Sequence, residues 1–193
     1  MKGTARRGGG RPLKGSEHAL RRSHRIEIGD THAPLKVARP RLRRTVMTIL
    51  KSLGRPRHGV SLTLVGDRTI RGLNHRYLGK SLATDVLAFS MEGLPSLSAS
   101  LPAPLLGEVI VSVETAKRQA REHGHSLHEE LDLLITHGLL HLVGYDDEDP
   151  LEARLMHERE MAILGRIYAR PSPSLRVGPV RQSQHSGNEE RQA

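Results

Sequence analysis

The segment that decides the fold is His137-Gly-Leu-Leu-His141-Leu-Val-Gly144-Tyr-Asp146-Asp147. Residues four apart share one face of a helix, so the two imidazoles can bind one metal ion. Gly144 favours a left-handed end to that helix, after which the chain turns back and brings Asp147 within reach. Three protein ligands with a fourth position open are typical of a catalytic zinc site. The alternative is an ordinary pair of one buried and one exposed histidine.

The 193-residue chain contains no cysteine and 12 histidines. Its length suits one domain with its own core. Without cysteine there is no disulfide, thiolate metal site or cysteine nucleophile, so any metal is bound by nitrogen and oxygen atoms. The same absence suits a reducing cytoplasm. No segment approaches the roughly 20 apolar residues that span a bilayer, and we expect no membrane association.

The net charge of +9 is concentrated near the two ends of the chain. Residues 1–25 carry eight lysines and arginines and one glutamate, whereas residues 26–169 carry 18 charges of each sign. Low apolar content predicts a basic disordered arm over 1–23 and a disordered tail over 169–193, with the domain between them over 24–168. The arm either adds salt-sensitive affinity for RNA or is a solubilising extension.

Apolar periodicity predicts strands separated by helices early in the chain and three helices at its end. Strands are expected at 25–28, 59–65, 84–89 and 108–113, and helices at about 40–53, 67–77, 114–123, 127–142 and 150–165. The N-caps are assigned to Asp67, Ser126 and Asp149. This order predicts an α+β domain in which a small mixed sheet of about four strands packs with helices.

Two imidazoles and a carboxylate suit zinc or a neighbouring divalent metal. A zinc ion held in this way can lower the pKa of bound water to about 7 and so support hydrolysis of an ester, an amide or a phosphodiester. The spacing resembles the metal helix of the metzincins, H-x-x-x-H-x-x-G-x-x-H. In H-E-x-x-H metalloproteases, a glutamate base follows the first histidine. That position is Gly138 here, which disfavours peptide hydrolysis.

Three segments resemble the YbeY family of ribosomal-RNA maturation endoribonucleases. Residues 137–147 are similar to its signature H-G-x-L-H-L-x-G-Y-D-H, and residues 73–89 (LNHRYLGKSLATDVLAF) to LN-x-x-YR-x-KD-x-PT-[ND]-VLSF. Residues 106–112 (LGEVIVS) are similar to its LG-D/E-x-x-I-S strand, and the likeness runs from about residue 25 to 168. It implies a cytoplasmic, single-strand-specific, metal-dependent endoribonuclease in 16S rRNA 3′-end maturation and ribosome quality control. The implied partners are ribosomal precursors, ribosomal proteins and a ribosome-associated GTPase.

The chain departs from the family pattern at two positions. The predicted zinc ligands are His137, His141 and Asp147, and the family usually has a third histidine where Asp147 stands. The extra negative charge is expected to make bound water less acidic and to make harder divalent ions more suitable. Leu78 stands where the family often has an arginine, which leaves Lys80 as the candidate catalytic residue, for phosphate contact and charge stabilisation. The alternative for Lys80 is a solvated surface lysine.

Two further functions stay open at this point. One is a ribosome-assembly RNA-binding factor whose metal stabilises the fold, and the other is a metal-dependent hydrolase of another substrate. Four aromatic residues are too few for a broad base-stacking platform, which keeps the assembly factor in play. His123, His125 and His128 form another histidine group, for which a second metal site is weighed against a solvated turn. Asp146 is assigned a turn or second-layer role, and Asn74 is expected to pin a loop.

Overall fold

The computed structural model describes residues 26–31, 38–91 and 104–168. The elements, in chain order, are β1 (Ile26–Thr31), α2 (Arg39–Ser52), β2 (Gly59–Val65), α3 (Asp67–Leu78), β3 (Val86–Ser90), β4 (Leu105–Ser112), α5 (Val113–Glu122), α6 (Leu127–Leu142) and α7 (Pro150–Tyr168). Each predicted strand and helix is present, with ends shifted by a few residues. The arm over 1–23 and the tail over 169–193 lie outside the described residues. Within the described ranges, no helix is both long and apolar enough to cross a membrane.

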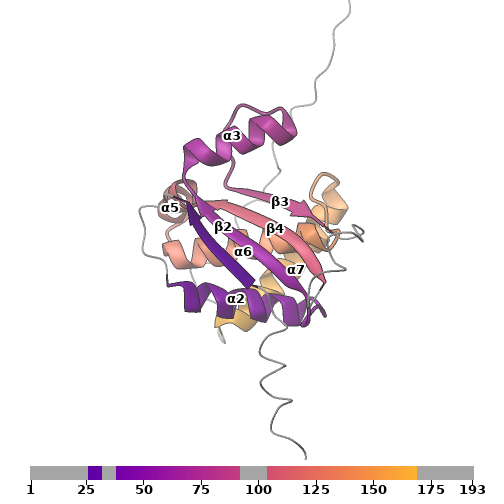
Figure 1. Ribbon diagram of the computed structural model, residues 1–193. Coiled ribbons are helices and arrows are strands. Elements are labelled where there is room, and N and C mark those ends of the chain that lie inside the picture. Colours follow the sequence, from indigo (N-terminus) through magenta and orange to yellow (C-terminus); the bar gives the residue numbers. More distant parts are fainter. Residues whose placement is uncertain (1–25, 32–37, 92–103, 169–193) are drawn as a thin grey trace, which may run out of the picture.

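The strands form one mixed sheet in the order β1-β2-β4-β3 (Figure 1). β2 runs parallel to both β1 and β4, whereas β3 runs antiparallel to β4. The two edges of the sheet are therefore β1 and β3. The α+β class and the mixed character of the sheet are confirmed.

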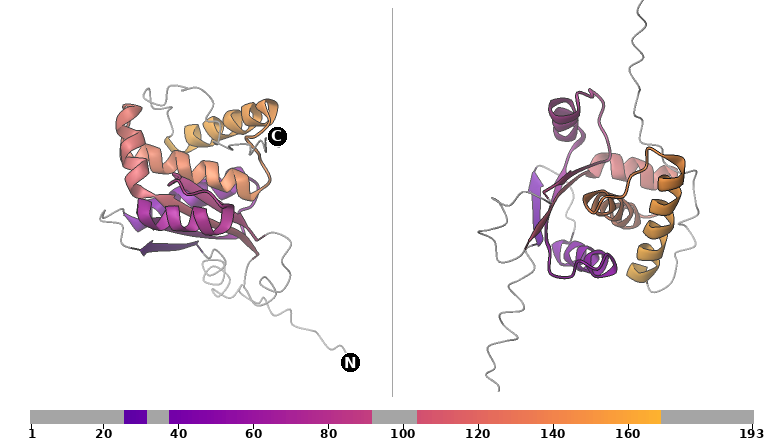
Figure 2. Two further views of the ribbon diagram at one scale, coloured as in Figure 1. Left: turned by 90° about the horizontal axis from the view of Figure 1, so that it is seen from above. Right: turned by 90° about the vertical axis from the view of Figure 1, so that its right-hand side faces the viewer.

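Four helices (α2, α5, α6 and α7) cover one face of the sheet, and α3 lies at the edge formed by β3 (Figure 2). The main core lies between the sheet and α6, where Val109, Leu134 and Leu139 are buried. Because side chains alternate along a strand, Ile110 faces the opposite side of β4 from Val109. A second, smaller cluster forms there under α3, and its buried members are Val65, Ile70, Leu87 and Ile110.

Gly138 allows α6 to lie close against the sheet. A Cβ atom at this position would stand 2.7 Å from Val109 Cγ1 and 3.2 Å from Val86 Cγ2. Glycine inside a helix costs about 1 kcal/mol relative to alanine. Here the missing side chain permits direct contact of the helix backbone with β3 and β4. The neighbouring His137 is thereby held close to the start of β3.

The N-cap predicted at Asp67 is wrong: the cap is Gly66, and it makes no side-chain hydrogen bond. Asp67 is the first helical residue of α3, and its carboxylate accepts hydrogen bonds from the start of α5. The donors are the side chains of Ser112, Thr115 and Arg118. In return, Glu114 accepts the backbone N–H of Asp67 at 2.7 Å. The two helices begin side by side, so each carboxylate accepts hydrogen bonds from the neighbouring helix. Local sequence does not reveal this arrangement.

A buried carboxylate joins α2, α6 and α7. Asp132 is fully buried, and its two oxygens accept the guanidinium nitrogens of Arg41 at 3.0 and 2.6 Å. The same oxygens accept the Thr45 hydroxyl at 3.0 Å and the Tyr168 hydroxyl at 2.5 Å. Burial and the adjacent Asp132 raise the pKa of the Tyr168 hydroxyl. Both oxygens of Asp132 are thus satisfied by protein donors.

Candidate metal centre

Helix α6 presents His137 and His141 together on one face. This helix starts at the predicted N-cap Ser126 with a capping box, because Ser126 accepts the backbone N–H of Glu129 and the Glu129 carboxylate accepts that of Ser126. The two imidazole Nε2 atoms lie 3.1 Å apart, with the rings nearly perpendicular at 82°. Their side chains are 21% and 28% exposed, so the pair is not the one-buried, one-exposed arrangement of the alternative.

The turn after α6 brings Asp147 back to the histidines. Gly144 adopts φ +92°, and the N–H of Tyr145 bonds to the carbonyl of Leu140 at 3.1 Å, as in a left-handed helix end. Asp146 Oδ1 then accepts the backbone N–H of Asp147 at 2.7 Å. A carboxylate that bonds to its following backbone in this way tightens a turn. Asp146 therefore has the turn role assigned to it.

The Asp147 carboxylate faces both imidazoles. Its Oδ2 lies 3.8 Å from His137 Nε2, and its Oδ1 lies 3.9 Å from His141 Nε2. Asp147 is only 6% exposed, so a cation between it and the histidines would be partly shielded from water. The three predicted ligands thus meet at one place in the fold.

These spacings suit a single metal ion. Ligand atoms placed tetrahedrally at about 2.0–2.2 Å from zinc stand roughly 3.3–3.6 Å from one another. The observed separations of 3.1, 3.8 and 3.9 Å bracket that range. Two imidazole nitrogens and one carboxylate oxygen are also donors that zinc and neighbouring divalent ions accept. The residues present therefore fit such an ion without a change of backbone.

Polar contacts behind the ligands fix which imidazole nitrogen faces the site. His141 Nδ1 lies 3.0 Å from the carbonyl oxygen of Tyr145. Because a carbonyl only accepts, Nδ1 carries the hydrogen and Nε2 keeps its lone pair for a metal. On the other side, His137 Nδ1 lies 3.4 Å from Glu160 Oε1. A carboxylate behind a ligating histidine orients the ring and increases its basicity.

Glu160 belongs to the candidate site and was not predicted from the sequence. It lies on α7 and is only 7% exposed, and its other oxygen stands 3.5 Å from His157 Nδ1. The sequence pattern of α7 indicates that Glu160 is buried, because it occupies a position of the apolar stripe of this helix. The buried residues of that stripe are Ala153, Met156, Glu160, Ile163 and Leu164. A carboxylate in such a stripe needs a partner inside the protein.

The surroundings of the two histidines shift their pKa values in opposite directions. Burial alone would lower the pKa of His137, but Glu160 above all, with Asp147 and Asp85, raises it above the ordinary value. Burial and the adjacent His137 lower the pKa of His141. Burial would raise the pKa of Glu160, but the adjacent His137 and His157 lower it. Glu160 therefore stays ionised at neutral pH, and a metal ion that binds here displaces any proton carried by His137.

Comparison with known proteins supplies the family. A family model described as "Endoribonuclease YbeY" matches residues 27–168. The chain belongs to the YbeY family. The Endoribonuclease YbeY of Anaeromyxobacter sp. (strain Fw109-5) is 41% identical over 160 residues, which cover 82% of this chain and 80% of the relative. That of Anaeromyxobacter dehalogenans (strain 2CP-C) is 43% identical over 153 residues, which cover 79% and 76%.

A solved structure also resembles this YbeY family chain. The solution structure of TM1509 from Thermotoga maritima aligns with a TM-score of 0.52 and 24% sequence identity. The alignment covers 82% of this chain and 99% of that one. At this identity the likeness concerns the fold, and it agrees with the mixed α+β architecture.

The remaining predicted residues lie in the last turns of α3 and on the loop that follows it. Lys80 is half-buried there, and its catalytic role stays a prediction. Asn74 donates its side-chain amide to the carbonyl of Leu82 at 2.8 Å, so it pins this loop as expected. Leu78 is 53% exposed.

A second histidine group lies between α5 and α6. His123 Nδ1 is 3.7 Å from Glu130 Oε2, and His125 Nε2 bonds to the same carboxylate. Glu130 is fully buried and only 4% of the His125 side chain is exposed, whereas His128 lies outside the group. The direct His125–Glu130 bond ties the turn to α6, and the burial of both side chains shows that the turn is not simply solvated. The ligand atoms of His123, His125 and Glu130 also lie close enough together for one metal ion, so a second metal site here stays a hypothesis.

Proposed function

We propose that this chain is a zinc-dependent endoribonuclease that cleaves single-stranded RNA in 16S rRNA 3′-end maturation and ribosome quality control. The observation that carries the proposal is the convergence of His137, His141 and Asp147 from two sides of one turn. The relatives named above are described as endoribonucleases, which supports RNA as the substrate. On family grounds, we also propose a cytoplasmic location and partners among ribosomal proteins and a ribosome-associated GTPase.

The chain itself would perform the binding and positioning steps. When bound, the zinc ion would supply Lewis acidity and a nucleophile at neutral pH. His141 offers its unprotonated Nε2 because Tyr145 holds the opposite nitrogen, and Glu160 holds the ring of His137 in the same sense. Asp147 adds a negative charge where the family usually has a histidine, so a harder divalent ion is also compatible with the site.

Peptide hydrolysis receives no support from the position after the first histidine. A side chain at Gly138 would run into Val109 on the sheet. The helix therefore has no room for the glutamate base that H-E-x-x-H proteases carry at this position. A phosphodiester substrate needs no base at that position of the helix.

Lys80 is our candidate for contact with the phosphate. Its loop is held by Asn74 and leads directly into β3, whose first residue, Val86, lies against Gly138 beside the metal ligand His137. A cation placed near a reacting phosphate stabilises the charge that develops in the transition state.

The proposal is tested by incubating the full chain with structured precursor rRNA, with and without a chelator. His137→Ala serves as the inactive variant, and His128→Ala serves as the matched control, because it removes an exposed histidine from the same helix. We expect cleavage that the chelator and His137→Ala abolish and that His128→Ala retains. Tight RNA binding without any cleavage by the intact protein would instead identify a ribosome-assembly factor with a structural metal.

A further inference from the structure

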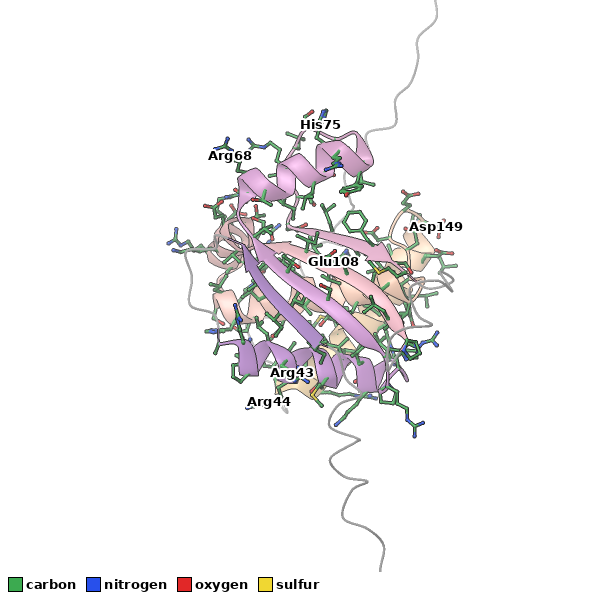
Figure 3. The ribbon with its side chains drawn as sticks, viewed as in Figure 1. Arg43, Arg44, Arg68, His75, Glu108 and Asp149 are labelled. Atoms are coloured by element: carbon green, nitrogen blue, oxygen red, sulfur yellow. The ribbon has the colours of Figure 1, made fainter. Side chains whose placement is uncertain are left out.

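Two helices of this domain expose similar sets of basic side chains. α3 exposes Arg68, Arg71, His75 and Arg76, and α2 exposes Arg39, Arg43, Arg44 and Lys51. Figure 3 shows Arg68 and His75 projecting from α3 at one end of the domain and Arg43 and Arg44 on α2 at the other. Charge alone therefore does not distinguish the two helices as surfaces for a polyanion.

Acidic neighbours do not neutralise the basic face of α3. Its one acidic residue, Asp67, is bonded to Arg118 at 2.6 Å. Among the described residues, Arg68 and Arg71 make no ion pair with a carboxylate, and Arg76 stacks over the ring of Tyr77 at 5.7 Å. Arg68, Arg71 and His75 are spaced so that they share one side of the helix. The face is thus a row of basic side chains open to solvent.

Position in the fold distinguishes α3 from α2. Tyr77 on α3 packs against Phe89 of β3, with ring centroids 5.3 Å apart, so α3 lies at the β3 edge. The start of β3 lies beside the candidate metal centre, because Val86 contacts Gly138, which follows His137 in helix α6. α2 lies instead near β1, at the opposite edge, and is bonded to the first half of α6 through Arg41 and Asp132.

Apolar side chains stand beside the charges on α3. Tyr77, Leu78 and Leu82 are 58%, 53% and 72% exposed. Unpaired bases stack on such exposed aromatic and apolar surfaces, while arginines bind the phosphates between them. An acidic protein surface would also meet the arginines, but the exposed aromatic ring and the adjacent metal centre favour RNA.

We infer that the outer face of α3, formed by Arg68, Arg71, His75 and Arg76, is the surface that binds the phosphate backbone of single-stranded RNA and leads the strand over the Lys80 loop to the metal centre. This inference rests on the proposed endoribonuclease function and names the surface that holds its substrate. α2, with a similar set of exposed basic side chains, is not part of that surface.

The experiment compares two triple variants of the full, metal-loaded chain. One carries Arg68→Gln, Arg71→Gln and Arg76→Gln on α3, and the other carries Arg39→Gln, Arg44→Gln and Lys51→Gln on α2. Both lose three positive charges from exposed helix positions, and both keep the basic segment at residues 1–25. Circular dichroism and metal content establish that each variant folds and loads. The affinity for a fluorescein-labelled single-stranded RNA is measured by anisotropy over a salt series, and KM and kcat are measured for its cleavage.

We expect the α3 variant to bind RNA about tenfold more weakly at low salt, with the log–log salt slope reduced by about 2, because each single-strand phosphate contact contributes roughly 0.7. KM should rise with little change in kcat, while the α2 variant stays near the wild type. Equal affinities of the two variants, with cleavage by the wild type intact, would overturn the inference and leave the proposed function standing. A wild-type protein that neither binds nor cleaves RNA would overturn both.

Discussion

Buried carboxylates stand beside both halves of α6. Those of the first half and those of the second half differ in the side chains that they contact. In the first half, Asp132 accepts hydrogen bonds from Arg41, Thr45 and Tyr168 at 2.5–3.0 Å. In the second half, Asp147 and Glu160 stand 3.4–3.9 Å from imidazole nitrogens.

The difference follows from the chemistry of the partners. Arginine is always charged at neutral pH, so it neutralises Asp132 permanently. Histidine can lose its proton and offer a lone pair, so the imidazoles beside Asp147 and Glu160 can hold a metal ion instead of a proton. One buried acid thus holds helices together, while the other two belong to the candidate metal site.

The largest expected effect is at Asp147. Asp147→Ala leaves two imidazoles, so we expect metal content near zero after desalting and cleavage slowed about a thousandfold, since loss of Lewis acidity removes about 4 kcal/mol of transition-state stabilisation. Asp147→His restores a third ligand and should retain the metal. Metal analysis by mass spectrometry checks both variants, and an unchanged metal content in Asp147→Ala would remove Asp147 from the ligand set.

The second largest effect is expected at Asp132, where the substitution should change the stability of the fold but not metal binding. Asp132→Ala leaves the Arg41 and Tyr168 donors without their acceptor, so we expect unfolding to become easier by about 3–5 kcal/mol. Urea unfolding in chelator measures this without a contribution from bound metal. The folded variant should load metal normally. A loss of metal by folded Asp132→Ala would show that the two halves of α6 are not independent.

Glu160 should affect the metal more weakly than a ligand does. Glu160→Gln keeps the shape of the side chain but removes the charge behind His137, and we expect metal affinity to fall about 10–100-fold. Glu158→Gln, an exposed change on the same helix, is the control and should bind as the wild type does. Competition with a fluorescent chelator gives both affinities. If the two variants bind metal equally, Glu160 does not orient His137.

The smallest effect is expected at the exposed pair between α3 and α5. Burial would raise the pKa of Asp67, but hydrogen bonds from Ser112, Thr115 and Arg118 outweigh it and lower the pKa from 3.8 to about 2. Because the folded pKa is below the unfolded one, this stabilisation is present above about pH 4 and is lost as pH falls through about 2.

The Asp67 side chain is 21% exposed and that of Arg118 is 53% exposed, so we expect Asp67→Asn to cost at most about 1 kcal/mol at neutral pH. Urea unfolding of both proteins at neutral and at acidic pH measures the difference, which should shrink in acid and in high salt. A difference that grows on acidification would contradict the assigned sign.

Features that depend on neighbouring residues in the chain were predictable. The four-residue spacing of His137 and His141, the capping box at Ser126 and the left-handed Gly144 are each settled within one or two helical turns. The side chains of His137, His141 and Asp147 therefore meet in the structure, while their role as metal ligands stays a prediction. The role of Lys80 and the identity of the metal stay predictions, because neither depends on backbone geometry alone.

The sequence by itself determined the helix that carries the two histidines, the turn that returns Asp147 and the family likeness, because spacing, caps and turns are short-range. Only the tertiary structure decided that Glu160 stands behind His137, that Asp67 binds the start of α5 and that α3 lies at the edge next to the metal centre. Each of these depends on which elements pack together. A carboxylate is placed by its own segment, but its partner comes from another helix, and no local pattern specifies that helix.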